Sequence, residues 1–112
     1  MTIIWHNPRC SKSRQTLALV EEKGDVTIRR YLDDAPGLDE IKQVHALLGG
    51  PVIGMMRAKD ALFRELGLTK DDDDARLFQA MAEHPALIER PIVLAKGKAA
   101  MGRPPEAVLG IL

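Results

Sequence analysis

The pattern of apolar residues changes twice within the first 32 residues, and this change constrains the fold more than any other feature. The stretch TIIW at 2–5 is short, apolar and β-branched, which predicts a buried strand that ends at Asn7. Apolar residues then recur at helical spacing from Ser11 until Gly24. The alternating run at 26–32 predicts a second strand. Strand, helix and strand form a βαβ unit with parallel strands and a right-handed crossover.

The middle of the sequence predicts helices. Apolar residues keep a helical period over 38–48, the run at 52–66 predicts two short helices, and 70–85 predicts another with an acidic first turn. We therefore expect a helical insertion at about 36–88 within a single domain over residues 1–112.

The end of the sequence predicts a hairpin and a helix. Two short strands are expected at 92–94 and 98–101, and a last helix at 106–112, because the proline pair at 104–105 can open a helix. The full order is β-α-β, a helical insertion, and then β-β-α. This order predicts a thioredoxin-like α/β fold with a small mixed sheet, a fold that usually keeps its chemistry where the first strand meets the first helix.

Charge and cysteine content exclude several functions. The chain carries 16 basic and 16 acidic side chains, which disfavours a nucleic acid or an anionic membrane as partner. No apolar run approaches the length of a membrane span, and the first residues do not resemble a secretory signal. One cysteine cannot form an internal disulfide or a Cys-pair zinc site. We therefore expect a cytoplasmic protein with no membrane partner, no metal and no bound cofactor.

The single cysteine, Cys10, lies between the end of the first predicted strand and the start of the first predicted helix. Unpaired N–H groups and the positive end of the helix dipole favour a thiolate there, and a thiolate is the nucleophilic form. The same groups can hold a tetrahedral anion. The alternative is a buried structural cysteine, but the position favours a nucleophile.

Three neighbours of Cys10 are candidates for stabilising its thiolate. Arg14 lies one helical turn later and can supply a positive charge, although it could equally be a surface residue. His6 could act as an imidazolium, but a structural role in organising the loop is slightly favoured. Ser13 could donate to the thiolate, and its default role is to cap the helix start.

Three arginines elsewhere are candidates for binding an anion. Arg90 and Arg103 each precede a proline, which biases them toward extended backbone, and a cis bond before Pro91 is conceivable. Arg57 lies in the predicted helical insertion. Each could be an ordinary surface charge, and spacing alone does not show whether the three converge on Cys10.

Spacing excludes other thiol chemistries. A Cys-based phosphatase loop needs an arginine at position 16, where this chain has a threonine. Position 13 is serine, so there is no CxxC pair and the chain is not a self-contained dithiol oxidoreductase. A catalytic Cys10 would need a thiol from outside the chain.

The stretch HNPRCSKSR at 6–14 resembles the active-site loop of the glutaredoxin-coupled arsenate reductases. The segments ELGL at 65–68, HPALIERPIV at 84–93 and RPPEAVLGIL at 103–112 are similar to segments of that family, in the same order. The resemblance covers essentially the whole chain. Its length is typical of a shorter sister group related to Spx-type proteins.

The resemblance implies a thioredoxin-like fold and a defined activity. Cys10 would attack arsenate, glutathione would resolve the thiol-arsenate adduct as co-substrate, and glutaredoxin would take up the mixed disulfide. The anion-binding arginines of the family fall on Arg57, Arg90 and Arg103 of this sequence.

Two other functions stay open. A thiol oxidoreductase of the same fold could act on a glutathione mixed disulfide instead of an oxyanion. A non-catalytic thioredoxin-like module could regulate or bind another protein, although the missing CxxC pair disfavours an internal disulfide switch.

Overall fold

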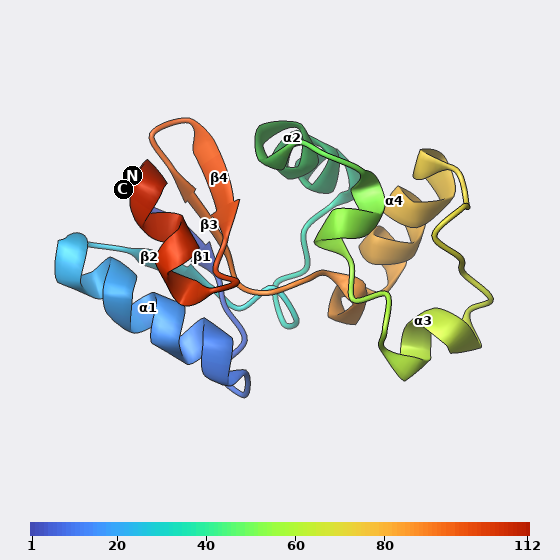
Figure 1. The fold of residues 1–112 in the computed structure, drawn as a ribbon, viewed down its shortest axis with the longest axis horizontal. Helices are drawn as coiled ribbons and strands as arrows, with labels where there is room; N and C mark the ends of the chain where they lie inside the picture. The colour runs from blue at the N-terminus through green and yellow to red at the C-terminus, as the bar shows by residue number, and fades with distance from the viewer. The chain divides into compact units, whose positions relative to one another are not determined.

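The computed structural model describes all of residues 1–112, and the chain folds into two compact units. The first combines Met1–Asp34 with Arg90–Leu112, contains the sheet, and is called here the thioredoxin-like unit (Figure 1). The second, Ala35–Glu89, is called the helical unit.

The thioredoxin-like unit is built on a four-stranded sheet in the order β2-β1-β3-β4. β1 (Ile3–Trp5) runs parallel to β2 (Thr27–Arg29) and antiparallel to β3 (Ile92–Ala95). β3 and β4 (Lys98–Met101) form the predicted hairpin. The predicted βαβ unit and the mixed sheet are therefore confirmed.

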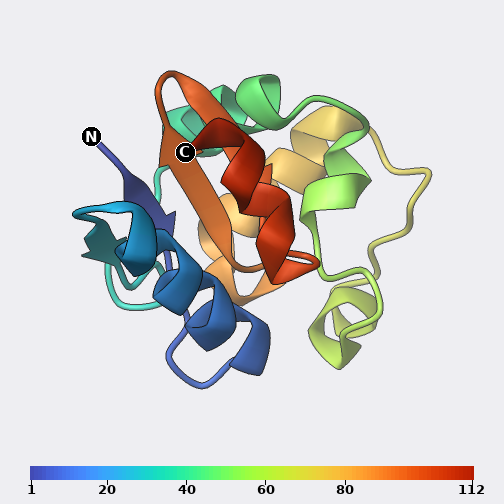
Figure 2. The same cartoon turned by 60° about the vertical axis from the view of Figure 1, so that its left-hand side comes forward.

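Two helices lie side by side against this sheet, α1 (Ser11–Lys23) and the 3-10 helix η3 (Pro105–Ile111) (Figures 1 and 2). A buried core joins them to the strands, made of Ile4, Val20, Val93 and Val108. Burying each such side chain contributes about 1.5–3 kcal/mol. This core packs α1 and η3 against the sheet, and Cys10 lies at the start of α1, a few residues after the end of β1.

The second strand is shorter than the sequence predicts. Alternation suggested a strand over 26–32, but β2 ends at Arg29. The chain turns there because the carbonyl oxygen of Arg30 accepts hydrogen bonds from the N–H groups of Asp33 at 3.0 Å and Asp34 at 2.8 Å.

The helical unit has three α-helices and two 3-10 helices: α2 (Leu38–Leu48), η1 (Val52–Met55), α3 (Ala61–Glu65), α4 (Asp74–Glu83) and η2 (Pro85–Leu87). α2 packs on α4, where the rings of His45 and Phe78 meet edge to face, 5.3 Å apart. The carboxylate of Asp73 caps α4 by accepting a hydrogen bond from the N–H of Arg76, so this helix begins later than position 70. None of the helices in the chain combines the length and apolar character needed to cross a bilayer.

Candidate functional site

Cys10 occupies the N-cap position of α1, directly after a tight turn. Asn7 forms the turn because its side-chain oxygen accepts a hydrogen bond from the N–H of Arg9 and its carbonyl accepts one from the N–H of Cys10, both at 3.0 Å. The carbonyl of Cys10 accepts the first hydrogen bond of the helix, from Arg14. Cys10 is buried, with 9% of the residue's surface exposed.

Opposing influences set the pKa of the Cys10 thiol. Burial raises this pKa, but the backbone N–H groups of Ser13 and Lys12 and the charges of Arg90 and Arg103 lower it, and the net pKa lies below the ordinary value for cysteine. The helix start and two guanidinium groups thus favour the thiolate, the form that attacks an electrophile.

Ser13 links Cys10 to His6. The Ser13 hydroxyl is fully buried, lies 2.7 Å from Nδ1 of His6, and accepts a hydrogen bond from the N–H of Asn7 at 3.0 Å. Both contacts bring the end of β1 against the first turn of α1. The backbone N–H of Ser13 faces the thiol of Cys10.

His6 contacts the first turn of α1 through this link, and the charges that act on the thiol of Cys10 come from other residues. Burial lowers the pKa of His6, and the nearby charges of Arg30 and Arg14 lower it further. A lowered pKa favours the neutral imidazole over the imidazolium at neutral pH. His6 therefore organises the turn.

Arg14 also supports the turn. Its Nη1 donates a hydrogen bond to the carbonyl of Pro8 at 2.9 Å. The charges that lower the pKa of Cys10 come instead from Arg90 and Arg103.

The structure brings Arg90 and Arg103 together with Cys10, although they are distant in sequence. Nε of Arg103 donates a hydrogen bond to the carbonyl of Arg90 at 2.8 Å, and Nε and Nη1 of Arg90 are buried. Both arginines precede a cis proline. Two guanidinium groups beside a thiolate at a helix start can bind an oxyanion and place it for attack.

Arg57 belongs to the helical unit. Its Nη1 pairs with a carboxylate oxygen of Asp60 at 3.2 Å, and its backbone N–H donates to the carbonyl of Leu87 at 2.7 Å. These contacts fix Arg57 within that unit.

The sequence reasoning missed Gly102, which lies between α1 and the cis proline at position 91. A Cβ atom on Gly102 would lie 2.7 Å from Cγ of Pro91 and 2.9 Å from Cγ2 of Thr16. The Gly102 N–H donates to the carbonyl of Pro91 at 2.9 Å. Only glycine allows this approach, which positions the neighbouring Arg103. A glycine at the end of a predicted strand was the feature of the sequence that could have indicated such a close backbone approach.

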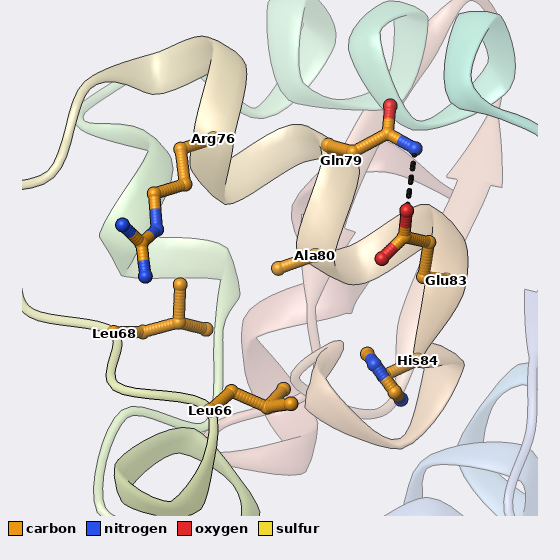
Figure 3. A pocket seen from close by; sticks show the side chains of 7 residues that line it. All are labelled: Leu66, Leu68, Arg76, Gln79, Ala80, Glu83 and His84. Carbon is orange, nitrogen blue, oxygen red and sulfur yellow. Dashed lines mark hydrogen bonds between the residues drawn. The ribbon is translucent and has the colours of Figure 1, made fainter.

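The helical unit has a cavity of about 250 Å³ between α4 and the Leu66–Leu68 segment (Figure 3). Three of its polar side chains, Arg76, Gln79 and Glu83, have partners. Arg76 contacts Asp72 and the carbonyl of Gly67, and Gln79 donates to Glu83 at 2.9 Å. All the residues that line this cavity belong to the helical unit, and none of them is among the candidate site residues around Cys10.

Comparison with known proteins covers nearly the whole chain. The model of the ArsC family matches residues 5–111. Two curated relatives named arsenate reductase, from Neisseria meningitidis serogroup A and Haemophilus influenzae, are 53% and 51% identical, over 97% and 98% of this chain and 96% and 97% of theirs. A solved structure described as arsenate reductase from Vibrio cholerae is 49% identical, with a TM-score of 0.95, covering 99% of this chain and 97% of that one.

Proposed function

The chain belongs to the ArsC family, and we propose that it reduces arsenate to arsenite through Cys10, with glutathione and glutaredoxin as reductants. The relatives named arsenate reductase, at about half identity over nearly full length, support arsenate as the substrate.

The observation that carries this proposal is the placement of Cys10. Its thiol has a lowered pKa, it stands at the start of α1, and two guanidinium groups act on it. In the proposed first step, Arg90 and Arg103 bind the arsenate oxygens while the thiolate attacks arsenic(V). A sulfur–arsenic bond forms and water leaves after protonation.

Glutathione completes the reduction. Its thiolate attacks the sulfur of Cys10, a disulfide forms, and the sulfur–arsenic bond breaks. Two electrons leave with arsenic, which departs as arsenite. A glutaredoxin thiolate then attacks the glutathione sulfur of the mixed disulfide, so a glutaredoxin–glutathione disulfide forms and Cys10 leaves as a thiolate. An outside thiol is required because Cys10 is the chain's only cysteine.

Two further assignments belong to this proposal. Arg57 would supply a third guanidinium to the oxyanion, as the family resemblance implies. The protein would work in the cytoplasm, where glutathione and glutaredoxin keep thiols reduced.

Arsenite release tests the proposal. The purified protein with arsenate, glutathione and glutaredoxin should release arsenite in proportion to enzyme, and omission of either thiol reductant should stop turnover. Absence of arsenite at every pH tried would contradict arsenate as substrate.

The same thiolate also suits a second function, reduction of a glutathione mixed disulfide. The lowered pKa of Cys10 serves attack on sulfur as well as on arsenic. Competition between arsenate and oxidised glutathione for Cys10 separates the two. Preferential reaction with the disulfide would favour the second function.

A further inference from the structure

A second cavity lies on the thioredoxin-like unit, with a volume of about 450 Å³. One wall is the segment His6–Arg9, which follows β1, and the other is formed by Arg30, Leu32 and Asp33, which follow β2. It therefore opens at the carboxyl ends of two adjacent parallel strands, where α/β proteins commonly bind ligands. We call it the turn cavity.

The lining of the turn cavity includes both positively and negatively charged residues. Arg9, Arg30 and Asp33 are among its lining residues, and all three are exposed. Leu32, which is 46% exposed, adds an apolar wall. Neighbouring Arg29 is engaged elsewhere, against Asp34 and the ring of Trp5. A ligand with two carboxylates, one ammonium group and a short apolar part would complement this lining.

The turn cavity is lined by the residue that directly precedes the nucleophile in the chain, and Cys10 itself is not among its lining residues. Arg9 directly precedes Cys10, and consecutive Cα atoms are about 3.8 Å apart. The backbone of this turn is fixed by the hydrogen bonds from Arg9 and Cys10 to Asn7. A ligand in the cavity would therefore bind beside a rigid wall that ends at Cys10.

The turn cavity differs from the oxyanion site. The arginines that act on Cys10 are Arg90 and Arg103, which do not line the cavity. Its volume lies within the range of cavities that bind organic ligands, roughly 300–1,000 Å³, and exceeds what a single tetrahedral anion fills.

We propose that the turn cavity binds the thiol that resolves Cys10, a small peptide thiol with two carboxylates and one ammonium group, of which glutathione is the example. Arg9 and Arg30 take the carboxylates, and Asp33 takes the ammonium group. The bound thiolate attacks the sulfur of Cys10, as in the reduction step above. The inference rests on the proposed function only for its use of an outside thiol.

Binding of S-methylglutathione tests the proposal without any reaction, because this analogue lacks a free thiol. Calorimetric titration should detect binding to the wild-type protein. Arg9→Ala and Arg30→Ala should each weaken it by about 10-fold or more, and Arg9→Lys should restore part of it. Arg64→Ala, an exposed arginine of the helical unit, is the matched control and should bind normally. Equal binding by wild type and both alanine variants, or no binding at all, would overturn the proposal.

A rate measurement separates a binding site from damage to the turn. Cys10 attacks one sulfur of a disulfide, the disulfide bond breaks, and one thiolate leaves. With oxidised glutathione the Arg9→Ala and Arg30→Ala variants should react about 10-fold more slowly, whereas with uncharged hydroxyethyl disulfide they should match wild type. Equal slowing with both disulfides would contradict the proposal. Neither measurement uses arsenate. The proposal for the turn cavity can therefore hold even if the protein does not reduce arsenate, and it can fail even if the protein does.

Discussion

Two regions build the site around Cys10, and they do so in different ways. The turn at 6–14 is continuous in sequence and supplies the thiol, its backbone donors and the His6–Ser13 link. The segment at 90–103 is remote in sequence and supplies positive charge through Arg90 and Arg103. Backbone donors at a helix start survive side-chain substitution, whereas guanidinium charges do not. Substitutions can therefore tell the two contributions apart.

The largest effect is expected at the thiol itself. Cys10→Ser keeps the size of the side chain but removes the nucleophile, so arsenite release should fall to the level without enzyme. The variant should still unfold cooperatively, because serine is a good N-cap residue. Residual turnover above background would show that Cys10 is not the nucleophile.

Gly102 tests how the remote segment is held against α1. Gly102→Ala places a Cβ atom 2.7 Å from Pro91, and relieving this contact should cost about 1–3 kcal/mol in the free energy of unfolding. Urea denaturation measures the loss. Gly110→Ala is the matched control, since its Cβ atom would meet nothing within 4 Å and should change stability by less than about 0.5 kcal/mol. Equal stabilities of the two variants would contradict the close packing.

Ser13 tests the internal link of the turn. Ser13→Ala removes the hydroxyl that contacts His6 and Asn7, and buried groups left without a partner should lower the free energy of unfolding by about 1–3 kcal/mol. The exposed Ser11→Ala is the control in the same helix turn and should change little. A Ser13→Ala protein as stable as Ser11→Ala would show that the link does not hold the turn.

Substitutions of Arg103 and Arg14 compare how much positive charge each of the two regions contributes at Cys10. Arg103→Ala should raise the pKa of Cys10, because a nearby positive charge is lost, while Arg14→Ala should leave it nearly unchanged. The rate of iodoacetamide alkylation against pH gives both values. A larger increase in Arg14→Ala would reverse the assignment of charges to the remote segment.

Features formed by consecutive residues could be predicted from the sequence. The βαβ unit, the hairpin and the position of Cys10 follow from runs of neighbouring residues, and the structure contains them. The end of β2 was misplaced because alternation continues through Tyr31 while the hydrogen bonds to Arg30 turn the chain.

Features that depend on the fold could not be predicted. No spacing rule shows that Arg90 and Arg103 come near Cys10, because the sheet order β2-β1-β3-β4 sets that proximity. The neutral state of His6 depends on burial and on Arg30, which follows a different strand. The close approach at Gly102 depends on Thr16 of α1 and on Pro91.

The lowered pKa of Cys10 also links its charge to stability. Because the folded state favours the thiolate, ionisation stabilises the fold fully at pH values above the pKa of the unfolded chain, and this contribution is lost as pH falls through the lower pKa of the folded state. Unfolding free energies of wild type and Cys10→Ser should therefore diverge in favour of wild type as pH rises through that window. Parallel curves would contradict the linkage.

The most direct test of the central claim is a titration of Cys10 in the folded and the urea-unfolded protein, followed by the ultraviolet absorbance of the thiolate. The chain has one cysteine, so subtracting the same titration of Cys10→Ser, which removes the absorbance of ionised Tyr31, leaves the signal of Cys10 alone. If the turn and the two arginines create a reactive thiolate, the folded protein should titrate at a lower pH than the unfolded chain. An equal or higher midpoint in the folded protein would contradict the claim.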